Sequence, residues 1–192
     1  MERIKQKHKH ELARFEVQKN NIRRLWNIQQ ETAELLYTFV IAKSPKHILE
    51  IGTSNGFSTF WLSLAAEQCN AIIDTIEVDE GRFKLAKENL ANRKNIIQRF
   101  GKAEYIIPEL TDKYDLVFID AGKINYINYI KLLQNKLNNN STIIADNVIS
   151  HKDTVKEYLD YIESSELFES VTLNIDSGLN IASFKKINKK EQ

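Results

Sequence analysis

A short apolar run that leads into a glycine turn and a helix constrains the fold of this chain more than any other stretch. Residues 47–51 are mostly apolar and stop at Gly52, which is typical of a strand buried in the centre of a parallel sheet. Gly52 and Gly56 permit positive φ angles and let a ligand approach the backbone closely. The apolar helix expected at 57–67 would point its N-terminal N–H groups at this turn. The stretch therefore predicts a ligand site where the strand ends, although an ordinary strand–turn–helix unit would share these features.

Two common nucleotide-binding patterns do not fit this turn. The residues after Gly56 are not Lys-Ser or Lys-Thr, so the turn is not a phosphate-binding loop. Ser54 and Phe57 stand where the dinucleotide pattern Gly-x-Gly-x-x-Gly needs its second and third glycines. A NAD-type oxidoreductase on a doubly wound sheet is thus an alternative that lacks its motif.

Strand and helix patterns alternate through the rest of the chain. We expect strands at 47–51, 71–77, 95–99, 115–119, 141–145, 169–175 and 180–186, and helices near 57–67, 80–91, 102–107, 123–137 and 152–163. This order predicts an α/β fold, a Rossmann-like doubly wound sheet of seven mostly parallel strands. The last two strands are separated only by residues 176–178, which predicts a hairpin and one antiparallel edge strand. Residues 138–140, three asparagines, are expected to form a polar turn.

Composition places the chain among single-domain globular proteins. Its 192 residues, 42% of them hydrophobic, predict one domain over 1–192, with a helical N-terminal segment at 1–44 and a Rossmann-like core at 45–192. Residues 2 to about 43 carry apolar side chains at helical spacing, and Pro45 would end this segment. Cys69 is the single cysteine, the N-terminus is charged, and the longest apolar stretch is too short to span a bilayer, so we expect a cytoplasmic protein.

The charges argue against a strongly basic partner-binding surface. Lys and Arg total 27 against 26 Asp and Glu, a net charge of +1, which provides no strong attraction for a polyanion. The basic run at 5–10 would touch RNA or an acidic partner in one interpretation. The near-neutral net charge favours the other, a solvated helix face.

Acidic and amide side chains follow the expected strands. Glu77 ends the second strand, 25 residues after Gly52, where an acid commonly accepts hydrogen bonds from the ribose hydroxyls of a nucleotide. Asp79 fits better as the N-cap of the next helix. Three oxygen donors end the fourth and fifth expected strands: Asp120, Asp146 and Asn147. Without His or Cys beside them they favour Mg²⁺, Mn²⁺ or Ca²⁺ over Zn²⁺, and Lys123 lies in the following turn.

Three phrases in this order and spacing resemble the metal-dependent O-methyltransferases, which include catechol and caffeoyl-CoA O-methyltransferases and many bacterial relatives. They are Leu-Glu-Ile-Gly-Thr-Ser-Asn-Gly at 49–56, Phe-Ile-Asp-Ala-Gly-Lys at 118–123 with Tyr126, and Ala-Asp-Asn-Val at 145–148. The resemblance runs from about residue 22 to 186. It implies a class I fold that binds S-adenosylmethionine (SAM), a divalent metal (Mg²⁺, or Mn²⁺ or Ca²⁺) and methylation of a metal-bound hydroxyl on a small catechol-like or phenolic acceptor.

The resemblance also implies residue roles. Asp120, Asp146 and Asn147 would bind the metal, and Lys123 would be the catalytic base. The residues that would bind SAM are Asn27, Ile28, Glu50, Gly52, Thr53, Ser54, Gly56, Ser58, Glu77, Val78, Ala103, Glu104 and Asp120. A tRNA hydroxyuridine acceptor, as in some bacterial relatives, and a non-catalytic SAM-binding protein remain alternatives. His151 follows the metal motif and would face the substrate or simply start a helix.

The sequence departs from the family pattern at four places. Lys102 replaces the Asp expected beside adenine, and Ser177 replaces the Asp of a substrate-side Asp-Gly-Leu, where Asp176 is a possible substitute. The three asparagines at 138–140 stand where relatives often carry Pro-Gly-Gly. The N-terminal region is short for the family, so part of the usual substrate cover would be missing or come from a second subunit. Because this region also carries Ile22, Leu25 and Trp26, a homodimer is expected in which the N-terminal segment helps to cover the active site.

Overall fold

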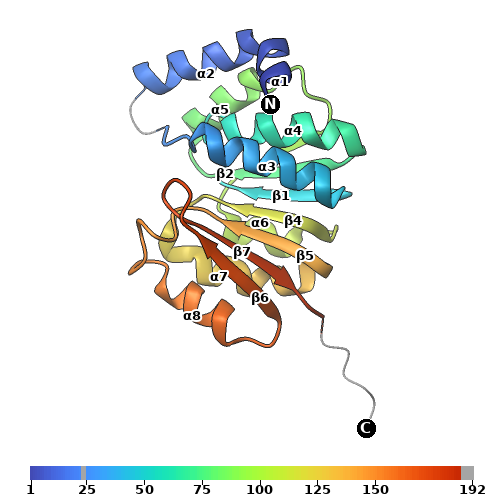
Figure 1. The fold of residues 1–192 in the computed structure, drawn as a ribbon, viewed down its shortest axis with the longest axis vertical. Helices are drawn as coiled ribbons and strands as arrows, with labels where there is room; N and C mark the ends of the chain where they lie inside the picture. The colour runs from blue at the N-terminus through green and yellow to red at the C-terminus, as the bar shows by residue number, and fades with distance from the viewer. Residues whose placement is uncertain (23–24, 187–192) are drawn as a thin grey trace.

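The computed structural model describes residues 1–22 and 25–186, in which seven strands form one sheet in the order β3-β2-β1-β4-β5-β7-β6 (Figure 1). The strands are β1 His47–Ile51, β2 Ile72–Glu77, β3 Ile96–Phe100, β4 Tyr114–Ile119, β5 Leu137–Ala145, β6 Phe168–Leu173 and β7 Leu179–Phe184. Strands β1 to β5 pair in parallel, and β7 runs antiparallel to both β5 and the edge strand β6. The predicted doubly wound α/β sheet is therefore confirmed.

Helices cover both faces of the sheet. They are α1 Glu2–Lys7, α2 Lys9–Asn21, α3 Gln30–Lys43, α4 Phe57–Cys69, α5 Glu80–Asn89, α6 Ala103–Glu109, α7 Tyr126–Leu133 and α8 Lys156–Ser164, with 3-10 turns η1 Lys123–Asn125 and η2 Gln134–Lys136. Side chains of α2 to α5 pack into one hydrophobic cluster, and those of α6 to α8 pack into a second on the opposite face (Figure 1). Neighbouring residues of a strand point to opposite faces, so Ile48 belongs to the first cluster and Leu49 to the second.

The helical segment expected over residues 2 to about 43 is interrupted. The described part of this segment forms the three helices α1, α2 and α3, and residues 25–29 before α3 adopt neither helix nor strand. Residues 23–24 and 187–192 lie outside the described residues. No proline or glycine marks the break; instead the Leu25 and Ile28 side chains are buried in the rest of the protein. Tertiary contacts therefore override the local helix propensity here.

The asparagine run at 138–140 was wrongly expected to form a turn. It lies inside β5, whose pairing with β4 shifts register between Tyr114 and Leu116. Asn140 has φ +64°, which marks the irregularity that these small polar residues accommodate.

Gly52 is required where β1 meets the ligand turn. Its φ is +105°, and a Cβ atom there would lie 2.2 Å from the carbonyl oxygen of Asp120. The turn after β1 and the end of β4 are thus in direct backbone contact. In the part of the chain that the structure describes, no helix is long and apolar enough to cross a bilayer.

Candidate active site

A cavity of about 680 Å³ opens at the carboxyl ends of β1, β2, β4 and β5. Parallel strands end at the same edge of a sheet, so residues far apart in sequence meet there. Ten of the predicted site residues line it: Asn27, Ile28, Gly52, Ser54, Glu77, Val78, Asp120, Lys123, Asp146 and Asn147. The structure therefore brings together three features that the sequence predicted at separate strand ends: the acid expected to bind a ribose, the oxygen atoms expected to bind a metal, and the lysine.

Glu77 is held in a fixed orientation at one end of the cavity. Its carboxylate accepts hydrogen bonds from the backbone N–H groups of Ser54 (2.7 Å), Val78 (3.0 Å) and Asp79 (2.9 Å). These bonds join the turn after β1 to the end of β2. The side chain of Asp79 accepts from Arg82 N at 2.9 Å, which confirms Asp79 as the N-cap of α5.

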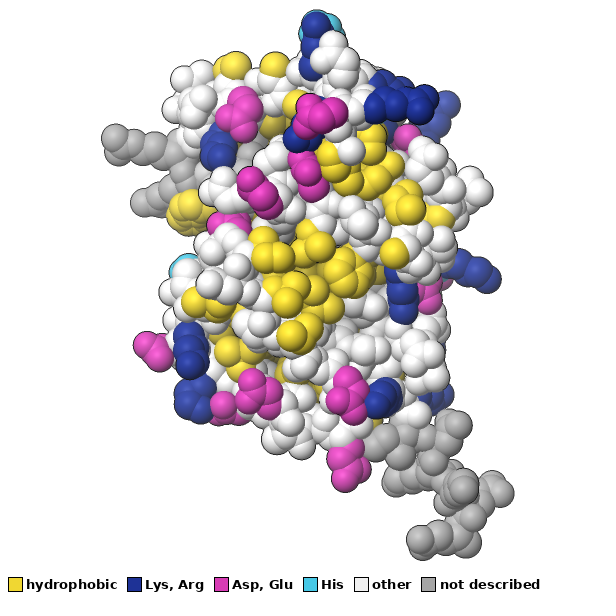
Figure 2. All heavy atoms as spheres, in the orientation of Figure 1, with side chains coloured by type: hydrophobic (Ala, Val, Ile, Leu, Met, Phe, Trp, Pro, Cys, Tyr) yellow, Lys and Arg dark blue, Asp and Glu magenta, His cyan; other side chains and the backbone are white. Residues whose placement is uncertain are grey.

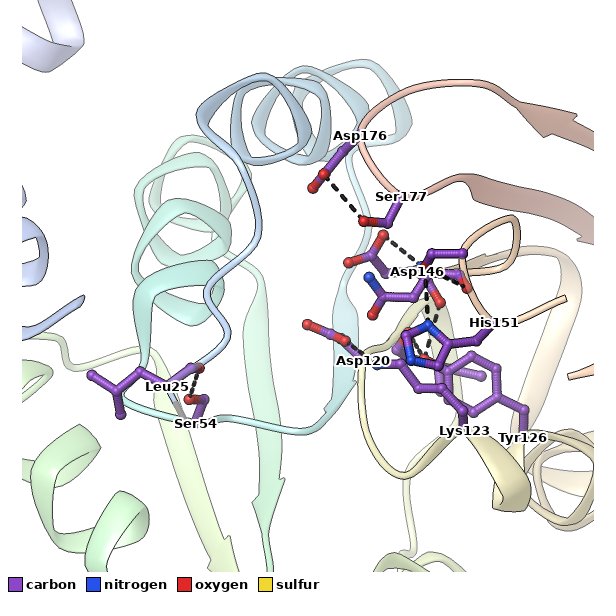
Figure 3. Close-up of polar contacts among 12 residues, drawn as sticks. Leu25, Ser54, Asp120, Lys123, Tyr126, Asp146, His151, Asp176 and Ser177 are labelled. Carbon is purple, nitrogen blue, oxygen red and sulfur yellow. Dashed lines mark hydrogen bonds and ion pairs between the residues drawn. The ribbon is translucent and has the colours of Figure 1, made fainter. Parts of the chain in front are cut away.

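The opposite end of the cavity lies at the ends of β4 and β5 (Figure 3). We call the polar residues there, Asp120, Lys123, Asp146 and Asn147, the lip. The Nζ atom of Lys123 donates to Oδ1 of Asp120 at 2.6 Å, and both side chains are largely shielded from solvent. The Tyr126 hydroxyl lies 3.1 Å from the carbonyl oxygens of both Ile119 and Asp146. This buried tyrosine fixes the two strand ends relative to each other.

Asp146 is electrostatically unfavourable in its ionised form. Burial, and next the charge of Asp120, raise the pKa of its carboxyl to about 7, although Asn147 N donates to it at 2.7 Å. Asn147 has φ +62°, a conformation that asparagine tolerates better than most residues and that brings its side chain to the cavity. The lip thus gathers negative charge that a cation would neutralise.

The donor atoms at the lip decide which metal ion would fit there. Within residues 1–22 and 25–186, no group of three or more His, Cys, Asp and Glu side chains is placed to hold a metal ion. The lip instead offers two carboxylates, Asp120 and Asp146, and the amide of Asn147. Mg²⁺ keeps several waters and usually needs only one or two protein carboxylates, so the chemistry of this donor set fits it.

Residues 25–29, which we call the strap, cross the cavity and are tied down at both ends. The Ser54 hydroxyl donates to the Leu25 carbonyl at 2.6 Å (Figure 3), and Gln29 N donates to Oδ2 of Asp176 at 3.2 Å. Between them Asn27 faces the cavity, and its buried Oδ1 atom has no hydrogen-bond partner among the described residues. Buried polar atoms are rarely left unpaired, so this one fits a donor from a bound ligand.

The family model described as O-methyltransferase matches residues 3–178. The chain belongs to the O-methyltransferase family. It is 36% identical over 111 residues to a catechol O-methyltransferase of Niastella koreensis. This match covers 54% of this chain and 50% of that protein. The chain spans about half the length of the curated relatives it matches.

Solved structures share the O-methyltransferase fold of this chain. Cofactor-bound Rv0187 from MTB superimposes with a TM-score of 0.85 at 23% identity, covering 92% of this chain and 90% of that one. An O-methyltransferase from Bacillus cereus in complex with SAH gives a TM-score of 0.81 at 21% identity and covers 91% and 90%. The seven-stranded arrangement described above is thus the fold of this family.

Six residues predicted to bind the cofactor do not line the cavity. They are Glu50, Thr53, Gly56, Ser58, Ala103 and Glu104. Glu50 is fully buried behind the turn, where Ser58 (2.6 Å), Thr75 (2.5 Å) and Thr59 donate to its carboxylate. Burial raises the pKa of Glu50 to about 7, against the effect of these hydroxyls. Glu50 therefore braces the turn, and cofactor contacts by the other five remain a prediction.

Several residues of the cavity were not assigned from the sequence. Gln29 and Arg82 line it, although no motif marks them. Asp176 and His151, considered only as possible substrate-facing residues, also line it, and the Nδ1 atom of His151 lies 2.9 Å from the Ser150 hydroxyl. Trp26 lines the cavity as well; the family resemblance places residues 26–28 over the cofactor and substrate, and only Asn27 and Ile28 were predicted to contact SAM.

Proposed function

We propose that this chain transfers the methyl group of SAM to a hydroxyl oxygen of a small acceptor and requires a divalent metal ion to do so. One observation carries the proposal. A single cavity has Glu77, an oriented acid suited to a ribose, at one end and the lip of Asp120, Lys123 and Asp146 at the other. A methyl donor bound at the first end and an acceptor at the second would meet within it.

The first end suits SAM. Glu77 would accept hydrogen bonds from the ribose hydroxyls with a carboxylate already oriented by three backbone N–H groups. The unpaired Oδ1 atom of Asn27 would accept from the amino group of the methionine portion. The Bacillus cereus relative, solved with SAH, supports the same choice of cofactor.

The second end suits a divalent metal and proton removal. Asp120, Asp146 and Asn147 would hold Mg²⁺ or Mn²⁺, with Ca²⁺ a further candidate, and the bound ion supplies positive charge that lowers the pKa of an acceptor hydroxyl. As a neutral amine, the form that an adjacent bound cation favours, Lys123 would take the hydroxyl proton at Nζ, which is oriented by Asp120 and lies 5.7 Å from the centre of the Tyr126 ring. Positioning of the acceptor oxygen beside the methyl group then provides much of the acceleration.

A catechol-like or phenolic acceptor fits best. The similar protein of Niastella koreensis is named a catechol O-methyltransferase. The cavity of about 680 Å³ must also hold the cofactor, which leaves space for a small molecule. A tRNA hydroxyuridine is the competing acceptor, and the net charge of +1 gives no support for a polyanion.

Methyl transfer from labelled SAM tests the proposal. The purified chain is incubated with catechol, a hydroxycinnamoyl thioester or bulk tRNA, each with Mg²⁺ or with EDTA. We expect label in the small acceptors only with Mg²⁺. Label confined to tRNA would establish the nucleobase alternative, and EDTA-resistant transfer would remove the metal from the mechanism. SAM binding by calorimetry without any transfer would indicate a non-catalytic protein, and binding of NAD instead would indicate an oxidoreductase.

We also propose that the chain forms a homodimer. Apolar side chains gather on the face shown in Figure 2, over the β6–β7 hairpin beside α3. Val171 of edge strand β6 is 52% exposed and pairs with Ile181 of β7. Exposed apolar patches of this kind commonly mark protein interfaces. A monomer by light scattering at micromolar concentration, with full activity, would refute the dimer.

A further inference from the structure

The strap holds one residue in an unusual position over the cavity. Leu25 and Ile28 are buried and Gln29 is tied to Asp176, yet the Trp26 side chain between them is 72% exposed. Trp26 has φ +41°, a conformation that is rare and costly for a bulky residue. A strained, exposed indole at a cavity rim therefore needs a contact that stabilises it.

Arg82 supplies that contact. Its guanidinium carbon lies 5.0 Å from the centre of the Trp26 ring, a cation–π arrangement. Arg82 is in the first turn of α5, where its N–H bonds the Asp79 side chain, so its backbone is fixed. Both side chains line the cavity, as do Glu77 and Val78 at the end of β2, which directly precedes α5. The pair therefore joins the strap to the strand end that would hold the ribose.

We propose that Trp26 and Arg82 form a cover over the nucleoside end of the cofactor site, and that this pair sets how fast the cofactor and its product leave. The inference rests on the SAM binding proposed above. A planar indole backed by a guanidinium offers a face against which a bound nucleoside would bury surface. Since the strap is tied at Ser54 and Asp176, release of the ligand requires the Trp26–Arg82 contact between those ties to open.

The cover predicts a specific pattern of dissociation rates. SAH dissociation is followed by stopped flow and SAM affinity by calorimetry. Trp26→Ala should speed SAH release and weaken SAM binding roughly 3- to 30-fold, the effect of about 0.7 to 2 kcal/mol of lost cation–π contact. Trp26→Phe keeps a ring and should stay close to wild type.

Arginine variants test whether the two residues act as one unit. Arg82→Ala should speed SAH release, and the Trp26→Ala/Arg82→Ala double variant should be no faster than Trp26→Ala alone. Arg93→Ala is the matched control, because its guanidinium lies 4.9 Å over the Phe60 ring outside the cavity. It should leave SAH release unchanged.

The chain also carries its own reporter. Its two tryptophans are Trp26 and the fully buried Trp61, so a fluorescence change on SAM binding should come from Trp26 and disappear in Trp26→Phe. Wild-type SAH release in Trp26→Ala, additive effects in the double variant, or a full fluorescence change in Trp26→Phe would each overturn the cover while leaving SAM binding intact. A wild-type chain that binds no SAM would overturn the proposed function itself.

Discussion

The ammonium group of Lys123 and the carboxylate of Asp120 form a 2.6 Å ion pair at the lip of the cavity. The two residues are three apart, on the loop that follows β4, and each is largely shielded by its neighbours. The same carboxylate is thus proposed to orient the base and to help hold the metal. These two roles are separable by substitution, because an ammonium group can donate to a carboxylate but cannot coordinate a cation.

Lys123→Ala should therefore damage turnover and spare metal binding. We expect turnover to fall roughly 10²–10⁴-fold, the usual contribution of a positioned acid–base group. Metal affinity, measured by titration calorimetry, should be kept or improved because a positive neighbour is lost. Turnover should recover partly at high pH, where hydroxide can remove the acceptor proton.

The control for this prediction is Lys156→Ala. Lys156 also pairs with an aspartate, Asp160, but on the exposed face of α8. Normal turnover in Lys123→Ala would make that lysine an ordinary surface residue. Loss of metal binding in the same variant would assign it a structural role in the loop.

Asp146→Asn should separate metal binding from stability. The folded-state pKa of Asp146, about 7, lies above the ordinary 3.8, so its ionisation disfavours the fold as pH rises through this range. Removing the charge should therefore stabilise the metal-free protein at pH 8, by at most a few kcal/mol at about 1.4 kcal/mol per pKa unit. Mg²⁺ should raise the melting temperature of the wild type and not of the variant.

Activity and melting curves together decide this prediction. The Asp146→Asn chain should be inactive with or without Mg²⁺, like the wild type in EDTA. An equal Mg²⁺-induced shift in melting temperature in both proteins would place the metal elsewhere or show that Asp146 does not bind it.

Alanine substitutions of Glu77 and Asp79 should change different properties, cofactor binding in the first case and stability in the second. Glu77→Ala should weaken SAM binding by roughly 1.5–3 kcal/mol, the range for hydrogen bonds to a charged group. Asp79→Ala should leave SAM affinity intact and cost about 0.5–2 kcal/mol of stability, since its carboxylate caps α5. Calorimetry and urea unfolding of both variants provide the comparison. Unchanged SAM affinity in Glu77→Ala would reduce that acid to a brace for the turn.

The central sheet and the strand-end residues were predictable because both depend on local pattern. Buried parallel strands are continuous apolar runs, and their carboxyl ends necessarily meet, so Asp120 and Asp146 could be placed together without a structure. The Gly52 turn was predictable for the same reason. Its positive φ and its backbone contact with Asp120 permit no side chain.

The strap was not predictable, because tertiary bonds and not local sequence break the helix there. Nothing between α2 and α3 signals an end, and the ties run to Ser54 and Asp176, far away in sequence. The burial of Glu50, in contrast, was predictable from the alternation of side chains along its strand. It shares a strand face with Ile48, so alternation points it into the helical layer, toward the hydroxyls of α4 and not toward the cavity.

Glu50 gives a pH-dependent prediction. Its folded-state pKa of about 7 exceeds the ordinary 4.5, so the folded chain binds this proton more tightly than the unfolded chain. Its contribution to stability is therefore complete below about pH 4.5 and is lost as pH rises through 7. The loss is on the order of 3 kcal/mol at about 1.4 kcal/mol per pKa unit.

Glu50→Gln should flatten this part of the stability profile. The variant keeps the shape of the side chain without the charge. The hydroxyls of Thr59 and Thr75, which share one carboxylate oxygen, can rotate to accept from an amide nitrogen at that position, while Ser58 donates to the amide oxygen. Urea unfolding between pH 5 and 8 should show the variant becoming more stable than the wild type above pH 7. The matched control is Glu157→Gln on the exposed side of α8, which should run parallel to the wild type. A Glu50→Gln profile that also runs parallel would mean that the three hydroxyl donors fully offset the cost of burying the charge.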